Sequence, residues 1–189
     1  KGVIIFGLVG RPDNGIYNAV HVDAARLLRM QGYDVRFLVV APPSNMVKDL
    51  LDADIPFHMI EPTVDPLVLS SAYNTMDIYA HARADGETFG VNIAEAMIHG
   101  LPTVTHIATP SFEGMGVFQA QTDLIDDGVN GFVVQNNPAD YSEALKKLID
   151  SKDTRESFGH NALEKAKREY HVDACIQKLE SIYREIVNV

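Results

Sequence analysis

Cysteine and basic residues are scarce in this sequence, and each scarcity excludes something. Cys175 is the only cysteine among 189 residues, so no disulfide can form within the chain, no cysteine-based zinc site is indicated, and a cytoplasmic location is expected. The formal net charge of −10 makes nucleic acid and anionic membrane surfaces poor partners. No signal peptide is recognisable, and no apolar run comes near the 18 residues of a membrane span.

The acidic charge is concentrated in the middle of the chain. Residues 51–150 contain fifteen acidic side chains and only three basic ones, which are Arg83, Lys146 and Lys147. An anionic ligand bound in this region therefore has to rely on backbone N–H groups, on helix N-termini, or on bases from elsewhere in the chain.

Several motifs of catalysis and nucleotide binding are missing as well. The sequence has no G-x-x-x-x-G-K-[ST] loop, no G-x-G-x-x-G, no G-x-S-x-G and no H-E-x-x-H. The seven histidines show no metal-ligand spacing. His81 and His106 stand at the ends of predicted strands and could line a cleft, although structural roles are favoured for both.

Apolar segments alternate with helical patterns along the whole chain. Strands are expected at 2–10, 35–41, 57–60, 77–81, 102–106 and 132–134, and helices at 17–31, 44–52, 66–74, 89–100, 138–150, 154–169 and 172–187. This alternation predicts an α/β fold with a doubly wound parallel sheet, followed by C-terminal helices. With 46% hydrophobic residues and no internal linker, residues 1–189 are expected to form a single domain.

Two loops follow the carboxyl ends of predicted strands, where such sheets bind their ligands. The loop "GRPDNG", residues 10–15, offers Gly10 for a close backbone approach and Arg11 as a forked donor to phosphate or carboxylate. Alone, it is read more simply as an ordinary turn with a surface arginine. The loop "DGETFG", residues 85–90, precedes a helix whose free N–H groups, from Thr88 to Val91, predict an anion site.

The helix at 89–100 is apolar nearly all round, which predicts burial, but it carries one narrow polar stripe. Thr88, Asn92, Glu95 and His99 fall within roughly 60° of one another on a helix. The stripe either meets solvent or lines a cleft, and the spacing does not decide between them. Glu87 likewise reads either as a favourable charge beside a helix N-terminus or as an acceptor for sugar hydroxyls.

The stretch "ETFGVNIAEAMIHGLPTV", residues 87–104, resembles the E-x(7)-E signature of retaining GT-B glycosyltransferases, the glycosyltransferase group 1 family that includes glycogen-synthase-like and sucrose-synthase-like enzymes. Gly10-Arg11, residues 77–82, "LIDDGVNGFVV" at 124–134 and the terminal helices resemble further parts of that family in the same order. The resemblance covers nearly the whole chain. It implies a Rossmann-like domain that forms the C-terminal, donor-binding half of a GT-B fold.

The resemblance also implies roles for the matched residues. Glu95 would bind the ribose hydroxyls of a nucleotide, and Glu87 would be the catalytic residue that contacts the donor sugar. Gly10 and Arg11, together with the segment Thr88, Phe89, Gly90 and Val91, would bind the diphosphate of a UDP or GDP sugar. No cofactor and no metal ion are implied.

Two departures stand beside this resemblance. Asn14 occupies the place of the family's usual lysine, so part of the positive charge on the phosphate side is missing, and Arg83 could substitute for it. The family's N-terminal domain, which holds most of the acceptor site for a sugar, a lipid or a protein glycan, is not in this sequence. Through that domain the protein could be peripheral at a membrane.

Three functions therefore stay open. The first is the donor-binding domain of a retaining hexosyl-type glycosyltransferase, inactive as a fragment. The second is a degenerate module that binds a nucleotide or a partner without catalysis, which Asn14 favours. The third is a GT-B relative such as a sugar-nucleotide epimerase. A phosphorylase is disfavoured because residues 82–123 contain no lysine for a pyridoxal cofactor.

Overall fold

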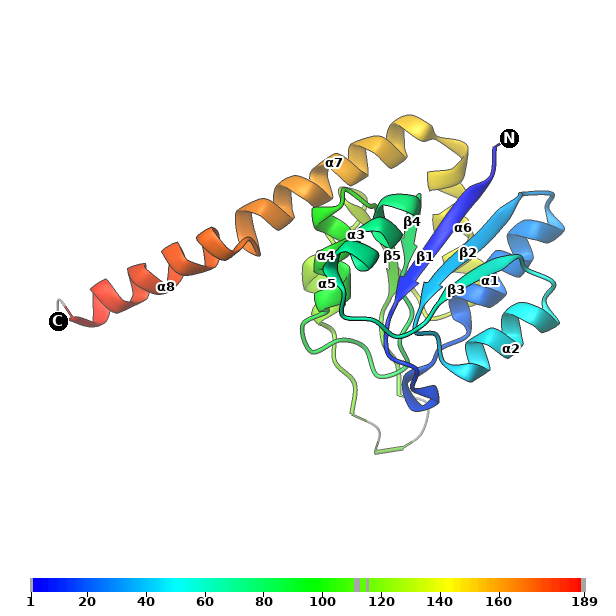
Figure 1. The fold of residues 1–189 in the computed structure, drawn as a ribbon, viewed down its shortest axis with the longest axis horizontal. Coiled ribbons are helices and arrows are strands. Elements are labelled where there is room, and N and C mark those ends of the chain that lie inside the picture. The colour runs from blue at the N-terminus through cyan, green and yellow to red at the C-terminus, as the bar shows by residue number, and fades with distance from the viewer. Residues whose placement is uncertain (1, 111–112, 115, 188–189) are drawn as a thin grey trace.

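The computed structural model describes residues 2–110, 113–114 and 116–187, and a single parallel sheet forms its centre (Figure 1). Its strands follow the order β3-β2-β1-β4-β5-β6, and every neighbouring pair is parallel. They are β1 (Ile4–Val9), β2 (Val35–Val40), β3 (Phe57–Ile60), β4 (Ile78–Ala80), β5 (Thr103–His106) and β6 (Gly131–Val134). The predicted doubly wound parallel sheet is confirmed.

Helices cover both faces of this sheet (Figure 1). One face carries α1 (Val20–Met30), α2 (Ser44–Asp52) and α6 (Pro138–Asp150), and the other carries α3 (Pro66–Thr75), α4 (Val91–Ile98) and α5 (Ala120–Leu124). The long helix α7 (Lys152–Glu169) packs along α4, and α8 (Val172–Val187) projects away from the body. The chain therefore crosses from one face of the sheet to the other between α2 and α3.

Local signals explain where most helices begin. The side chains of Asp65, Asn137 and Ser151 accept hydrogen bonds from N–H groups in the first turns of α3, α6 and α7. Because Ser151 caps α7, that helix starts at residue 152 and not at the predicted 154. Helix α1 starts at residue 20 and not at 17, because residues 14–16 form a short 3-10 turn (η1, Asn14–Ile16) capped by Asp13.

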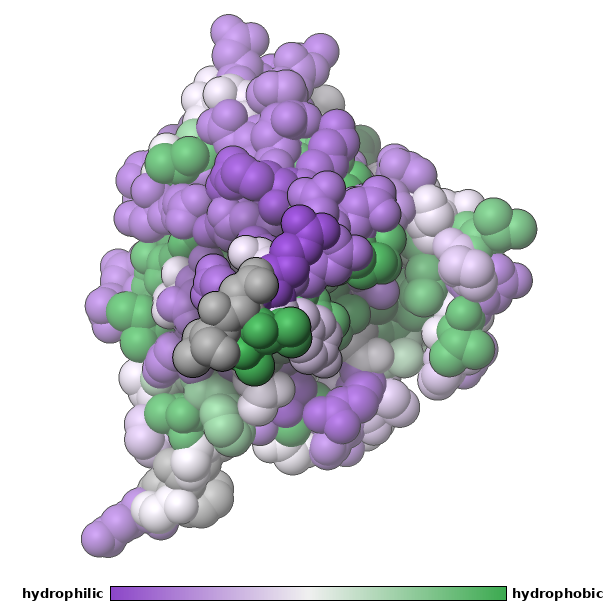
Figure 2. Space-filling view, turned by 90° about the vertical axis from the view of Figure 1, so that its left-hand side faces the viewer, coloured by the Kyte–Doolittle hydropathy of each residue, from purple (hydrophilic) through white to green (hydrophobic). Residues whose placement is uncertain are grey.

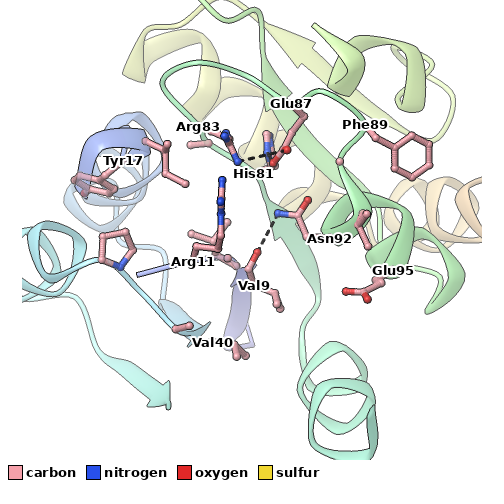
Figure 3. Close-up of a pocket in the computed structure, with 18 of the residues that line it drawn as sticks. Val9, Arg11, Tyr17, Val40, His81, Arg83, Glu87, Phe89, Asn92 and Glu95 are labelled. Carbon is pink, nitrogen blue, oxygen red and sulfur yellow. Dashed lines mark hydrogen bonds and ion pairs between the residues drawn. The ribbon is translucent and has the colours of Figure 1, made fainter. Parts of the chain in front are cut away.

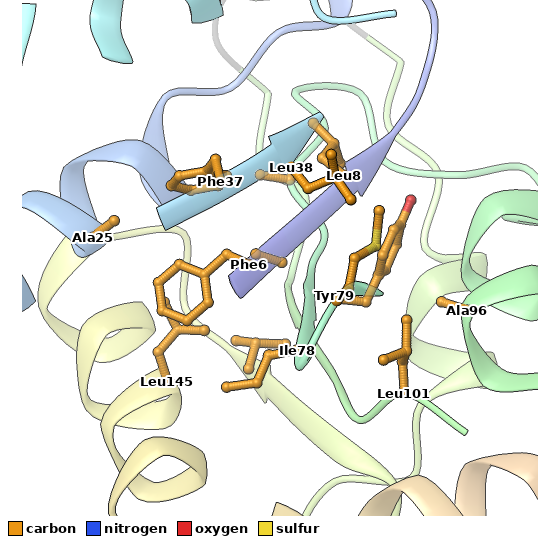
Figure 4. Packing of buried hydrophobic residues seen from close by; sticks show 14 of the residues in the cluster. Phe6, Leu8, Ala25, Phe37, Leu38, Ile78, Tyr79, Ala96, Leu101 and Leu145 are labelled. Atoms are coloured by element: carbon orange, nitrogen blue, oxygen red, sulfur yellow. The ribbon is translucent and has the colours of Figure 1, made fainter. Parts of the chain in front are cut away.

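The core lies between the central strands and the helices on either face. Phe6 of β1 meets Phe37 of β2 edge to face, with ring centroids 5.6 Å apart. Figure 4 shows Phe6 among Phe37, Ile78 and Leu145, so that three strands and α6 contribute to one cluster. Because helices cover both faces, side chains on both sides of these strands are buried, which is why their sequences read as continuous apolar runs.

Helix α8 has no buried residue, although one of its faces is apolar. Its exposed apolar side chains are Val172, Ile176, Leu179, Ile182, Tyr183, Ile186 and Val187. Figure 2, which views the side from which α8 projects, shows apolar side chains interspersed among hydrophilic ones. Within the described part of the chain, no helix combines the length and the apolar character that crossing a membrane requires.

His21 of α1 is fully buried, and neither of its ring nitrogens has a hydrogen-bond partner among the described residues. Its ring packs against those of Tyr17 and Phe37. Burial, assisted by the nearby rings of His106 and His81, lowers the pKa of His21 to about 3. Burial therefore favours the neutral form of His21 in the folded protein.

This burial predicts a loss of stability in mild acid. In the unfolded chain His21 binds a proton with the ordinary histidine pKa of 6.5. As far as His21 is concerned, the free energy of unfolding is therefore at its full value above that pH and decreases as the pH falls toward 3. Between pH 7 and pH 5 His21 alone should account for about 2 kcal/mol of lost stability. In urea unfolding at both values, His21→Leu should remove that share of the pH dependence, while His58→Leu on the exposed edge of β3 should not. An unchanged pH dependence in His21→Leu would contradict the burial of a neutral ring.

Candidate active site

A cleft of about 390 Å3 opens at the carboxyl ends of β1 and β4, where the strand order reverses (Figure 3). It is built by the loops after β1, β2 and β4 and by the first turns of α4. The lining includes Gly10, Arg11, Tyr17, Val40, Pro43, His81, Arg83, Glu87, Thr88, Phe89, Gly90, Val91, Asn92 and Glu95. Both loops that the sequence singled out thus meet in one cleft, at the topological switch point that such sheets use for ligands.

The two loops are joined directly. Tyr17 and Arg83 form an isolated antiparallel bridge, and the N–H of Ala84 donates to the carbonyl of Ile16 at 2.9 Å. On the other side of the cleft, the amide of Asn92 in α4 donates to the carbonyl of Val9 at the end of β1, at 3.0 Å. These bonds fix the positions of the cleft walls relative to one another.

The N-terminus of α4 opens toward the cleft. Gly90 is its N-cap, with a left-handed backbone at φ +90°, and the helix therefore begins at Val91 and not at the predicted residue 89. Among the described residues, no acceptor is found for the N–H groups of residues 88–92. These unpaired donors sit at the positive end of the helix dipole, which is a favourable place for an anion.

The predicted polar stripe of this helix divides into two parts. Asn92 and Glu95 face the cleft, whereas His99 packs on α3, stacking on the ring of Tyr73 with centroids 5.0 Å apart. The expected burial of the apolar side chains holds for Ile93, Ala96 and Met97 but not for all of them. Phe89, Val91 and Ile98 are 47%, 61% and 37% exposed, because they face an open groove toward α8.

Glu87 is almost completely buried and is held from several directions. Its N–H donates to the side chain of Gln121 at 2.9 Å, and its carbonyl accepts from the N–H of Ala120 at 3.0 Å. Its carboxylate lies 3.1 Å from Nε2 of His81 and 3.7 Å from the guanidinium of Arg83. Burial by itself would raise the pKa of Glu87, but the hydrogen bond and charge of His81, with Arg83, keep it below the ordinary value.

The two arginines of the cleft differ in their engagement. Arg83 makes a two-point contact with the carboxylate of Asp85, at 2.6 and 3.0 Å. Arg11 is exposed, and within the described residues its guanidinium has no hydrogen bond or ion pair. Figure 3 shows both side chains extending into the same space. Arg11 is thus the cation that is free to meet an anionic ligand, while Arg83 has first to leave Asp85.

Glu95 lies one turn beyond Asn92 on the cleft side of α4. One of its carboxylate oxygens accepts a hydrogen bond from the hydroxyl of Tyr73 at 2.8 Å. That hydroxyl also reaches the carbonyl of Asn92, at 3.2 Å. Tyr73 is buried, and its contact holds the carboxylate of Glu95, which lines the cleft.

Asn14 does not belong to this arrangement. The side-chain amide N–H of Asn14 donates to Ser44 Oγ at 2.9 Å, and its side-chain oxygen accepts from the N–H of Asn45 at 3.0 Å. Asn14 thus caps α2 from outside the helix. Conversely, the sequence placed Asn92 on the polar stripe without giving it a role, did not indicate Tyr17, and favoured a structural role for His81. The position of His81 at a strand end was the only available signal for it.

A second groove of about 710 Å3 lies on the far side of α4, between this helix and α8. Its walls are mostly apolar, with Val91, Ala94 and Ile98 on one side and Leu179 and Ile182 on the other. It shares Glu95 and Phe89 with the first cleft. Titratable groups and free N–H donors converge on the first cleft, which makes that cleft the candidate active site.

The fold of this chain matches the folds of solved GT-B glycosyltransferase structures. The crystal structure of HepE from Anabaena in complex with UDP and glucose matches it with a TM-score of 0.77 at 18% identity, over 96% of this chain and 48% of that one. At this identity the likeness concerns the fold, and it agrees with the predicted α/β architecture.

The sequence comparison gives the family. Residues 3–151 match the family described as Glycosyl transferases group 1, and the chain belongs to it. It is 26% identical over 190 residues to the capsular polysaccharide biosynthesis glycosyltransferase CapM of Staphylococcus aureus, covering 95% of this chain and 45% of CapM. It is 31% identical over 145 residues to a D-inositol 3-phosphate glycosyltransferase of Corynebacterium kroppenstedtii, covering 76% and 29%. The chain spans less than half the length of these curated relatives.

A substitution at Gly86 tests how tightly the loop after β4 is packed. A Cβ there would overlap the carbonyl oxygen of Phe118, and the backbone is left-handed at φ +71°. Gly128 has nearly the same φ, +73°, but open space around it. We expect Gly86→Ala to lower the free energy of unfolding by about 2–5 kcal/mol and Gly128→Ala by only about 1–2 kcal/mol. Urea unfolding of both variants measures the difference, and equal losses would show that the loop is not held against residue 118.

Proposed function

We propose that this chain is the donor-binding domain of a retaining glycosyltransferase that uses a nucleoside-diphosphate sugar. The observation that carries the proposal is the convergence, in one cleft, of the unpaired N–H groups at the start of α4, the free Arg11 and the two carboxylates of Glu87 and Glu95. Separately, HepE, which shares the fold, was crystallised with UDP and glucose. Membership in the group 1 family supports the transferase class.

In this proposal the diphosphate lies at the N-terminus of α4. The N–H groups of Thr88 to Val91 donate to it, and Arg11 supplies a full positive charge from the opposite wall. Gly10, at the exit of β1, lets the ligand approach the backbone closely. These donors do the work that a metal ion does in other sugar-nucleotide sites, so the proposed site needs no metal and no cofactor.

The two carboxylates divide the sugar contacts between them. Glu95, oriented by Tyr73, accepts hydrogen bonds from the ribose hydroxyls. Glu87, kept ionised by its neighbours, faces the donor sugar and stabilises positive charge that develops at the anomeric carbon. The acceptor, whether a sugar, a lipid or a protein glycan, is held mainly by a further N-terminal GT-B domain, which also excludes water on closure. This chain alone is therefore expected to bind donor without transferring sugar.

A second candidate is a binding module without catalysis. Asn14 is turned away from the cleft to cap α2, and Arg83 is tied to Asp85, so Arg11 is the one cleft cation within the described residues that is ready for a diphosphate. A weaker phosphate site is compatible with a module that holds nucleotide only. A longer form of the protein that binds donor but transfers no sugar to any acceptor would favour this candidate.

The ribose role of Glu95 is tested by calorimetry. Glu95→Gln removes a charged acceptor and should weaken the binding of UDP or GDP, whichever the chain prefers, by about 1–3 kcal/mol. Tyr73→Phe should have a smaller effect, because the carboxylate remains but is no longer oriented by the tyrosine hydroxyl. Glu164→Gln on the exposed side of α7 serves as the control. Unchanged affinity in Glu95→Gln would mean that its stripe faces solvent in function.

The phosphate role of Arg11 is tested by comparing a nucleoside diphosphate with its nucleoside. Arg11→Ala should weaken UDP by about 1–3 kcal/mol and leave uridine nearly unchanged, because only UDP carries the anion. Arg83→Ala measures whether the second guanidinium leaves Asp85 to contribute. Arg36→Ala, in the exposed pair with Asp34, is the matched control. Equal losses for UDP and uridine in Arg11→Ala would show that the residue acts through packing.

A further inference from the structure

His81 is a buried polar residue in the wall of the cleft that the proposed reaction does not yet use. It follows β4 directly and is 2% exposed. Its backbone carbonyl accepts a hydrogen bond from the hydroxyl of Tyr141 at 2.9 Å, and its ring stacks near that of Tyr79. The side chain reaches from the carboxyl end of β4 to Glu87 on the following loop (Figure 3).

Both ring nitrogens of His81 are engaged, and their partners determine where the proton lies. Nε2 is 3.1 Å from a carboxylate oxygen of Glu87, and Nδ1 is 2.8 Å from the hydroxyl of Thr105, which is fully buried in β5. An ionised carboxylate can only accept, so Nε2 carries a proton. The Thr105 hydroxyl is hydrogen-bonded to the other ring nitrogen, Nδ1. Thr105, His81 and Glu87 thus form a chain of hydrogen bonds from the sheet to the cleft.

We propose that His81 is a positioning residue for Glu87, with Thr105 fixing the ring of His81. The inference rests on the proposed function, in which Glu87 contacts the donor sugar. The second carboxylate oxygen of Glu87 lies 3.7 Å from the guanidinium of Arg83, which is longer than a direct hydrogen bond. Without His81 the partners left to this carboxylate are the guanidinium of Arg83 and the side-chain amide of Asn92, and the carboxylate would turn toward them and away from the sugar. His81 therefore decides which oxygen of Glu87 is presented to the donor.

The test separates the sugar contact from nucleotide binding. The affinities of UDP, UDP-glucose, GDP and GDP-mannose are measured by calorimetry, and the ratio of sugar-nucleotide to nucleotide affinity is compared between variants. His81→Phe keeps the shape of the ring but loses both hydrogen bonds. His81→Gln can keep a donor to Glu87, and Thr105→Val removes only the outer partner. Thermal unfolding of each variant establishes that it is folded.

We expect His81→Phe to change the ratio by about tenfold in the same direction as Glu87→Gln, with little change in the affinity of the nucleotide alone. His81→Gln should restore most of the wild-type ratio, and Thr105→Val should fall between. In a double-mutant cycle, His81→Phe should add little in the background of Glu87→Gln, because both act through the same carboxylate.

Other outcomes separate the failures. If Glu87→Gln changes the ratio and His81→Phe does not, the inference is overturned while the role of Glu87 stands. If His81→Phe weakens nucleotide and sugar-nucleotide equally in a folded protein, His81 supports the cleft as a whole and does not orient Glu87. If Glu87→Gln leaves the ratio unchanged, or if no nucleotide binds to the wild-type chain, the proposed function itself is refuted.

Discussion

The parallel pairing of β1 and β4 in the middle of the sheet is the constraint from which the cleft follows. Phe6 lies opposite Ile78, and Gly7 opposite Tyr79. The chain leaves β1 toward α1 on one face and leaves β4 toward α4 on the other, so the two loops part at their carboxyl ends. A space lined by backbone and loop side chains must open there. Gly7 leaves room for the side chain of Met76, which lies against β1 where a Cβ would otherwise be.

Two hydrogen bonds to the carbonyl of Val9 connect the β1–β4 pair to the candidate active site. The hydroxyl of Tyr79 donates to the carbonyl of Val9 at 3.0 Å, and the amide of Asn92 donates to the same carbonyl. The end of β1 is thereby tied both to its neighbouring strand and to the first turn of α4. An anion at that helix terminus is consequently held at a defined distance from the loop that carries Arg11. The cleft thus has rigid walls, although its residues come from loops.

The electrostatics of the cleft differ from those of the chain as a whole. The net charge of the chain is −10, but backbone N–H donors and two guanidinium groups lie together around the cleft. The carboxylates of Glu87 and Glu95 in this cleft are each hydrogen-bonded to a side chain of the protein. His81 donates to Glu87, and Tyr73 donates to Glu95. A carboxylate held by such a partner keeps its orientation, which a freely exposed acid does not.

The sequence by itself determined the alternation of strands and helices, the class of fold and the two loops at the carboxyl strand ends. These features depend on local periodicity, glycine placement and capping residues, which act over a few neighbouring positions. Family-like spacing also indicated Glu87 and Glu95 before any geometry was known. Only the tertiary structure decided the strand order, the bond between His81 and Glu87, the pairing of Arg83 with Asp85, and the turning away of Asn14. Some of these features join segments that are far apart in the sequence, and the others depend on which partner a side chain selects among its neighbours. Their geometry is set by how the whole sheet is wound and not by local sequence.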